Sequence, residues 1–236
     1  MTMANAATRQ VRVFVALCDN KTQGIQPVGA KIGDGDVPDD NLYWGCTDGF
    51  GSYFTHGGNW KVVKSERDLS HQIMRKLILK HSKEDVELTA FAYRGSEIHR
   101  CIEDFQAAAV EGKSDLVAYI GHNGLMDFEL KAPVAAQDNK TEVMVLCCMS
   151  EGYFGQRLRD AGCRPMLMTR QLMYPGSFIL SAALEAWIHD KKREDIRAVA
   201  GQSYAKNQKI SVQAATGVFA TAREIAGAKT DTPLGR

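Results

Sequence analysis

The chain has 236 residues, of which 44% are hydrophobic and 24% charged, a composition typical of a globular protein with one buried core. Its 29 Lys and Arg residues against 28 Asp and Glu leave a net charge of +1, which excludes an overall basic field for nucleic acid. No apolar run reaches the roughly 18 residues that a membrane span needs, so we expect neither nucleic acid nor membrane as a partner.

The N-terminal part predicts a buried first strand rather than a secretory peptide. Residues 11–18 (VRVFVALC) are apolar and β-branched, and the polar residues Asp19, Asn20 and Lys21 follow where a leader would have a small-residue cleavage site. Six cysteines show no zinc-site spacing, and a chain of this length does not need disulfides. We therefore expect a reducing, cytoplasmic environment and no metal or cofactor.

The next part of the chain predicts a long insertion and then a helix. Residues 21–65 are rich in Gly, Asp, Asn and aromatic residues without a helical period, which favours an insertion with short strands around 41–44 and 51–55. Leu69, Ile73 and Leu77 recur every four residues, which predicts a helix from about residue 65 to 81.

The rest of the chain predicts strands that alternate with helices. Apolar runs predict strands over 86–93, 115–121, 142–148 and 165–169, and Ser96 is a candidate N-cap of a helix over 96–111. Further helices are predicted over 151–161, from beyond Pro175 to about 190, and over 194–209. We expect one domain over residues 1–230 and a flexible tail over 231–236.

This alternation predicts an α/β fold, in which helices cover both faces of a mostly parallel sheet in a three-layer sandwich. Ligands of such sheets bind outside the carboxyl ends of the strands. Of the residues that follow the predicted strands, a histidine after one strand and a cysteine at the end of the next stand out: His122 and Cys148.

A cysteine and a histidine at neighbouring strand ends favour nucleophilic catalysis. Cysteine attacks a carbonyl carbon as thiolate, and a nearby histidine can take the thiol proton and return it to a leaving amine. Cys148 also directly precedes a predicted helix, whose positive end favours an anion. Strand alternation sends Cys147 to the opposite face. The alternative is a packed cysteine and an ordinary turn histidine.

Two segments resemble the catalytic elements of caspase-like (clan CD) cysteine peptidases. DLVAYIGHNGLMDF is similar to their strand followed by histidine, and VMVLCCMSEGYF to their strand followed by cysteine, closest to legumain and gingipain. The resemblance implies a caspase-like sheet with the flavodoxin-like strand order 2-1-3-4-5, and a peptide or protein as substrate. It also implies that Cys148 is the nucleophile and His122 the general acid/base.

The resemblance assigns further roles at this edge. Asn20 corresponds to the asparagine that orients the histidine in legumain-like enzymes, and Asp19 would hold a basic substrate side chain, as in basic-specific relatives. The oxyanion donors would be backbone amides near Asn123 and Gly124 and that of Cys148. Ser150, in the serine place of the cysteine motif, joins the substrate-binding group.

Two departures leave other functions open. The family has His-Gly where this chain has His122-Asn123, and only 26 residues separate His122 from Cys148. These favour a catalytically degenerate regulatory or interaction module with the same fold. A third possibility is a Cys-His amidohydrolase acting on small amides, which shares the same pair of residues. The oligomeric state is not predicted.

Overall fold

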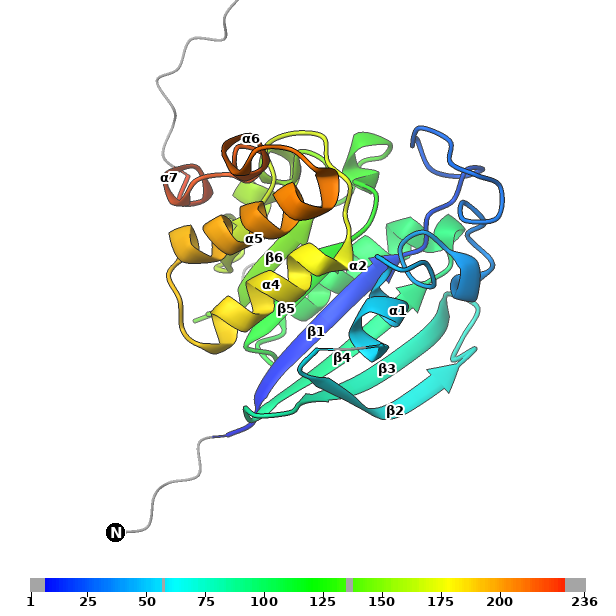
Figure 1. Cartoon of the computed structure of the whole chain (residues 1–236), viewed down its shortest axis with the longest axis horizontal. Helices are drawn as coiled ribbons and strands as arrows, with labels where there is room; N and C mark the ends of the chain where they lie inside the picture. Colours follow the sequence, from blue (N-terminus) through cyan, green and yellow to red (C-terminus); the bar gives the residue numbers. More distant parts are fainter. Residues whose placement is uncertain (1–6, 57, 135–137, 228–236) are drawn as a thin grey trace, which may run out of the picture.

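The structure is a computed structural model that describes residues 7–56, 58–134 and 138–227. Its centre is one seven-stranded sheet in the order β2-β3-β4-β1-β5-β6-β7 (Figure 1). The strands are β1 (Arg9–Ala16), β2 (Trp60–Arg67), β3 (Ile73–His81), β4 (Val86–Tyr93), β5 (Leu116–Ile120), β6 (Glu142–Leu146) and β7 (Arg164–Met168). The predicted tail over 231–236 lies outside the described residues.

The sheet is mixed, and this corrects the predicted strand order. β4, β1, β5, β6 and β7 run parallel to one another. β3 pairs antiparallel with β4, and β2 antiparallel with β3, which extends the sheet beyond β4. The order therefore differs from 2-1-3-4-5, and only part of the sheet is parallel. An antiparallel pair needs no helical crossover, so it leaves no helix in the sequence between its strands.

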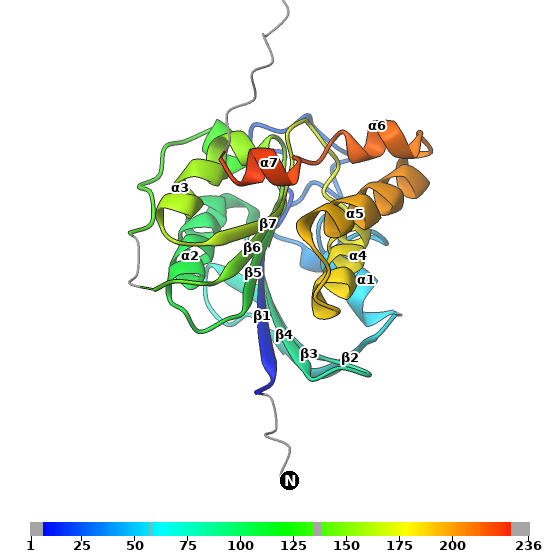
Figure 2. The ribbon, with the colours of Figure 1, turned by 90° about the vertical axis from the view of Figure 1, so that its left-hand side faces the viewer.

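Helices cover both faces of the sheet and give the α/β fold (Figure 2). One face carries α1 (Phe50–Thr55), α4 (Ser177–Ile188), α5 (Arg193–Gln208) and α6 (Val212–Thr216). The other carries α2 (Ile98–Val110) and α3 (Gln156–Asp160), and the short α7 (Ala222–Ile225) contacts β7. Short turns are η1 (Pro38–Asp40), η2 (Gly95–Glu97), η3 (Gly124–Met126) and the π-helical η4 (Glu151–Gly155).

Alternation along the strands divides the core between the two faces. In β1, Val13 and Val15 pack under α4 and α5, whereas Phe14 and Ala16 belong to the cluster beneath α2. The central strands are buried on both faces, as their continuous apolar runs predict. Among the described residues, no helix combines the length and apolar character of a membrane span.

Three predicted elements and one predicted helix cap are wrong. The predicted helix over 65–81 consists of the end of β2, a turn and β3, and the expected strand around 51–55 is helix α1. Residues four apart lie on the same face of a helix, and they also lie on the same face of a strand, because every second side chain of a strand points the same way. The spacing of Leu69, Ile73 and Leu77 therefore fits both structures. Ser96 lies within η2 and its side chain caps no helix. The segment around 41–44 forms turns rather than a strand.

Candidate active site

The sheet brings the loops of His122 and Cys148 to the same edge. Ile120 in β5 pairs with Leu146 in β6, and His122 and Cys148 each follow two residues after that pair. Neighbouring strands lie about 4.8 Å apart, so residues the same number of positions beyond a parallel pair start from neighbouring points of the sheet edge. The side-chain nitrogen of Asn123 donates to the carbonyl oxygen of Cys148 at 2.7 Å and ties the two loops together.

Cys148 lies in a tight connection between β6 and the helical turn that follows. Its side chain is partly exposed, whereas Cys147 is fully buried. Met149 has φ 51°, a left-handed conformation that costs a non-glycine residue free energy and is often kept at functional sites. The Cys148 sulfur contacts the backbone of Met173, which donates its N–H at 3.4 Å and accepts at 3.5 Å.

A carboxylate orients His122. The imidazole Nε2 lies 2.7 Å from Oδ2 of Asp127, and the same oxygen accepts the backbone N–H of Gly24 at 2.9 Å. Because an ionised carboxylate only accepts hydrogen bonds, Nε2 carries the proton and Nδ1 of the neutral ring is the free base. His122 is 8% exposed. Among the described residues, no hydrogen bond joins its ring to the Cys148 sulfur.

The turn that carries His122 depends on Gly121. This residue has φ 146°, and a Cβ atom placed on it would lie 3.1 Å from the carbonyl oxygen of Ala16. A side chain there would therefore meet both an unfavourable backbone conformation and a backbone contact. The Tyr119 hydroxyl donates to the carbonyl oxygen of His122 at 2.7 Å and fixes the loop from the other side.

The structure does not bring Asn20 to His122. The Asn20 amide donates to the carbonyl oxygen of Val28 at 2.8 Å and accepts the Val28 N–H at 2.9 Å. Both ends of the amide are thus used within its own loop. In this geometry Asp127, and not Asn20, contacts the imidazole, which argues against the predicted orienting role of Asn20.

Asp19 is also engaged locally, which argues against its predicted role as a pocket for a basic side chain. It is 6% exposed. One carboxylate oxygen accepts the backbone N–H of Lys21 at 2.9 Å, and the other accepts the Thr22 hydroxyl at 2.7 Å. These bonds stabilise the turn after β1 and leave little of the carboxylate for a ligand.

The remaining predicted residues divide into backbone and structural roles. Among the described residues, the backbone amides of Asn123, Gly124 and Cys148 donate no hydrogen bond, but Asn123 and Gly124 are buried. The Asn123 side chain is fully buried in its contact with the Cys148 loop. Ser150 is fully buried as well, and its hydroxyl donates to the Val145 carbonyl at 2.7 Å. Ser150 is therefore a structural residue, which corrects its predicted substrate-binding role.

Sequence reasoning missed three residues of this site. Asp127 had a usable signal, since it is an acidic residue within one turn after His122. Tyr43 and Met173 had none, because they come from distant segments. Burial raises the pKa of Tyr43 well above its usual range, and the neighbouring Cys18 and Cys148 thiols raise it further, so the phenol stays neutral beside the sulfur.

Comparisons with protein-family models, curated proteins and solved structures found no match. Among the described residues, no group of three His, Cys, Asp or Glu side chains is arranged to hold a metal ion. The side chains and backbone groups at this edge of the sheet are thus the basis for its chemistry.

Proposed function

We propose that the protein is a caspase-like cysteine hydrolase that cleaves peptide bonds. Cys148 is the nucleophile, His122 the general acid/base, and Asp127 the residue that positions His122. The observation that carries this proposal is the register of β5 and β6, which puts the histidine and the cysteine at equal steps beyond one paired position. The carboxylate on Nε2 adds support, since it leaves Nδ1 as the base.

The position of the pair in the sheet also supports a binding site. β1 pairs with β4 on one side and with β5 on the other, so the order of the parallel strands reverses at β1. In open α/β sheets, ligands bind outside the carboxyl ends of the strands next to such a reversal. His122 follows β5, which is the neighbour of β1 in the sheet.

The reaction needs one covalent intermediate. The imidazole Nδ1 takes the thiol proton, and the Cys148 sulfur attacks the peptide carbonyl carbon to form a tetrahedral oxyanion. When the carbon–nitrogen bond breaks, the imidazolium returns the proton to the leaving amine and a thioester remains. Water, deprotonated by the same imidazole, then hydrolyses the thioester and restores the thiol. Attack requires the sulfur to exchange its Met173 contact for the imidazole.

The oxyanion would be held by backbone amides. Those of Gly124 and Cys148 come from the two loops that the Asn123 side chain ties together. Donors fixed by the fold stabilise developing charge without reorganising during the reaction. Gly124 is closely packed, since a Cβ there would lie 2.6 Å from the Phe128 ring. Close packing gives that donor a fixed position.

Hydrolysis of fluorogenic peptides tests the proposal. The substrates are a peptide set with each of the twenty residues before the scissile bond, and wild type is compared with Cys148→Ala and Cys147→Ala. The proposal predicts turnover by wild type, loss of at least about a thousandfold in Cys148→Ala, and retention in Cys147→Ala. Equal turnover in wild type and Cys148→Ala would refute it. Ammonia release from free asparagine and glutamine, without peptide cleavage, would favour the small-amide alternative.

A non-catalytic module is the second candidate, and two observations favour it. His122 is largely buried, and the Cys148 sulfur contacts Met173 rather than the imidazole. In such a module, the histidine would hold the loop through Asp127, and the cysteine would only pack against the loop after β7.

Alkylation by iodoacetamide separates the two candidates. Burial raises the pKa of Cys18 to about 12 and that of Cys163 to about 11, so little thiolate forms at these sites near pH 7. An enzyme should label first at Cys148, and His122→Gln should slow this labelling at pH 6–7 by about tenfold or more. A rate at Cys148 that is the same in wild type and in His122→Gln would favour the module.

A further inference from the structure

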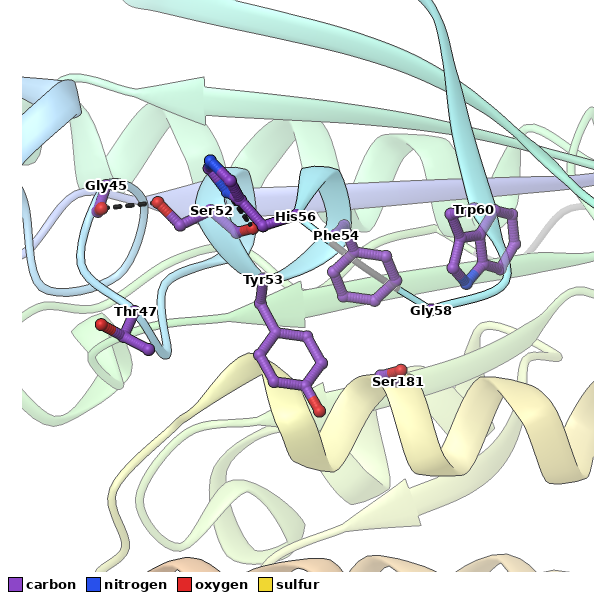
Figure 3. Close-up of a pocket in the computed structure, with 9 residues that line it drawn as sticks. All are labelled: Gly45, Thr47, Ser52, Tyr53, Phe54, His56, Gly58, Trp60 and Ser181. Carbon is purple, nitrogen blue, oxygen red and sulfur yellow. Dashed lines mark hydrogen bonds between the residues drawn. The ribbon is translucent and has the colours of Figure 1, made fainter.

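A cavity lies between α1 and α4, and neither Cys148 nor His122 lines it (Figure 3). Its volume is about 530 Å³, within the range of small-molecule sites. Tyr53 and Phe54 of α1, Trp60 at the start of β2 and Ser181 of α4 contribute to its walls. With neither His122 nor Cys148 in its walls, it is separate from the candidate active site.

One wall of this cavity is aromatic and apolar, with the Phe54 and Trp60 rings tilted by 54° to each other. The Phe54 ring stacks on Phe50 with centroids 4.4 Å apart, and the Trp60 ring follows with its centroid 6.1 Å from that of Phe54. Phe50 in turn stacks on Trp44 at 5.6 Å. This row of buried rings is a rigid surface, against which another flat ring gains apolar contact at a low entropic cost.

The cavity also has a polar group without a partner. The indole Nε1 of Trp60 is buried and has no hydrogen-bond acceptor among the described residues, and Trp60 as a whole is 7% exposed. Figure 3 shows this nitrogen on the side of the ring toward Gly58 and Ser181. An unpaired buried donor costs free energy, and an acceptor brought by a ligand would recover it.

Charge selects the kind of ligand. None of the described residues that line the cavity carries a carboxylate, an ammonium or a guanidinium group. The His56 ring turns back to its own helix, where Nδ1 lies 2.8 Å from the Ser52 carbonyl oxygen. Burial raises the pKa of Tyr53, so its hydroxyl remains a neutral phenol. A charged ligand would therefore lose hydration here without gaining an opposite charge.

We propose that this cavity binds a neutral, flat small molecule with a hydrogen-bond acceptor, such as an aromatic amide. The ring of the ligand packs on Phe54 and Trp60, and its carbonyl oxygen accepts the Trp60 indole N–H. Ser181, on the facing helix, closes the other side of the site.

Fluorine NMR of the full chain labelled with 5-fluorotryptophan tests this assignment. The chain has three tryptophans, so Trp60→Phe identifies the Trp60 resonance by its loss. The probes are benzamide, toluene, which lacks the acceptor, and benzoate, which adds a charge. We expect benzamide to shift the Trp60 resonance in a saturable way, and to bind at least about fivefold more tightly than toluene or benzoate, as one hydrogen bond allows.

A second variant keeps the proposal testable if Trp60→Phe does not fold. Ser181→Leu fills the cavity from α4 and should weaken benzamide binding at least tenfold, whereas Ala182→Leu, one residue along the same helix, should leave it unchanged. Absence of a saturable shift of Trp60 would overturn the proposal. Equal affinity for benzamide and toluene, or unchanged binding in Ser181→Leu, would also overturn it.

Discussion

Asp127 decides which imidazole nitrogen of His122 can act as a base. Its carboxylate oxygen lies 2.7 Å from Nε2 and favours the tautomer with the proton on that nitrogen. Asn at this position could donate an amide N–H to Nε2, which would favour the tautomer with the proton on Nδ1. We expect Asp127→Asn to lower kcat for peptide hydrolysis by about a hundredfold or more, with a small change in KM. Steady-state kinetics with the best peptide substrate measure both parameters.

A structural role for Asp127 would give a different pattern. The pH profile of kcat/KM should shift in Asp127→Asn, because the substitution replaces the group that contacts the imidazole Nε2. Glu129→Gln, which removes an exposed carboxylate in the same loop, should leave the profile of wild type. A variant that loses stability but keeps both the pH profile and kcat would show that Asp127 only holds the loop.

At this scale, the sequence indicated the two candidate catalytic residues but not their hydrogen-bond partners. His122 and Cys148 were visible because each follows an apolar strand, and parallel strands end at a common edge. The carboxylate partner depends on how a loop folds back, so Asn20 was chosen where the structure has Asp127. The burial of Ser150 could not be predicted for a similar reason, since its hydroxyl contacts that of Thr169, which directly follows β7.

At the scale of elements, the buried side chain of Asn41 stabilises the segment after β1. Asn41 is fully buried, donates to the carbonyl oxygens of Cys18 and Asp34, and accepts the backbone N–H groups of Cys18 and Tyr43. We expect Asn41→Ala to lower the free energy of unfolding by about 2–4 kcal/mol, because it leaves several buried groups unpaired. Urea unfolding followed by circular dichroism measures the change.

Asn20→Ala is the matched control in the same segment. Its amide bonds only with Val28, at a partly buried place, so we expect a loss of about 1 kcal/mol and nearly unchanged peptide hydrolysis. If Asn20→Ala abolished hydrolysis while the protein remained folded, the orienting role first predicted for Asn20 would be restored and that of Asp127 would fall.

Elements whose apolar residues fit only a strand or only a helix were predictable, and those whose spacing fits both were not. β4, β5 and β6 are short apolar runs between polar residues, and their strands were located within two residues of their ends. β3 was taken for a helix, since several of its residues are only partly buried, which leaves an incomplete pattern, and a bulge between Ile73 and Arg75 interrupts its alternation. The antiparallel pair β2–β3 therefore went unpredicted, and with it the strand order.

For the whole molecule, buried thiols predict loss of stability in alkaline solution. In the unfolded chain, a thiol ionises near its ordinary pKa of 9.0, whereas burial raises the pKa of Cys18 to about 12 and that of Cys163 to about 11. The folded state then binds more protons than the unfolded state between these values. Stability from this source is complete below pH 9 and falls as the pH rises toward 11–12.

The expected loss is about 1.4 kcal/mol for each of these two thiols at pH 10. We therefore expect the free energy of unfolding in urea, measured under reducing conditions, to be at least about 3 kcal/mol lower at pH 10 than at pH 7. Cys101 and Cys147, whose pKa burial also raises, add to this loss. Cys163→Ala should show a smaller decrease over the same range. A free energy of unfolding that stays constant from pH 7 to pH 10 would contradict the burial of these groups.

In the proposed mechanism, Cys148 and His122, in the loops after β6 and β5, act together at the carboxyl edge of the sheet. Labelling with a peptidyl acyloxymethyl ketone tests it most directly, since a catalytic thiolate displaces the carboxylate of this weak electrophile and forms a stable thioether. Intact-mass and peptide mass spectrometry then count and locate the label. We predict one label per chain, on Cys148, and none in His122→Gln. Labelling of another cysteine, or equal labelling of Cys148 in wild type and His122→Gln, would contradict the claim.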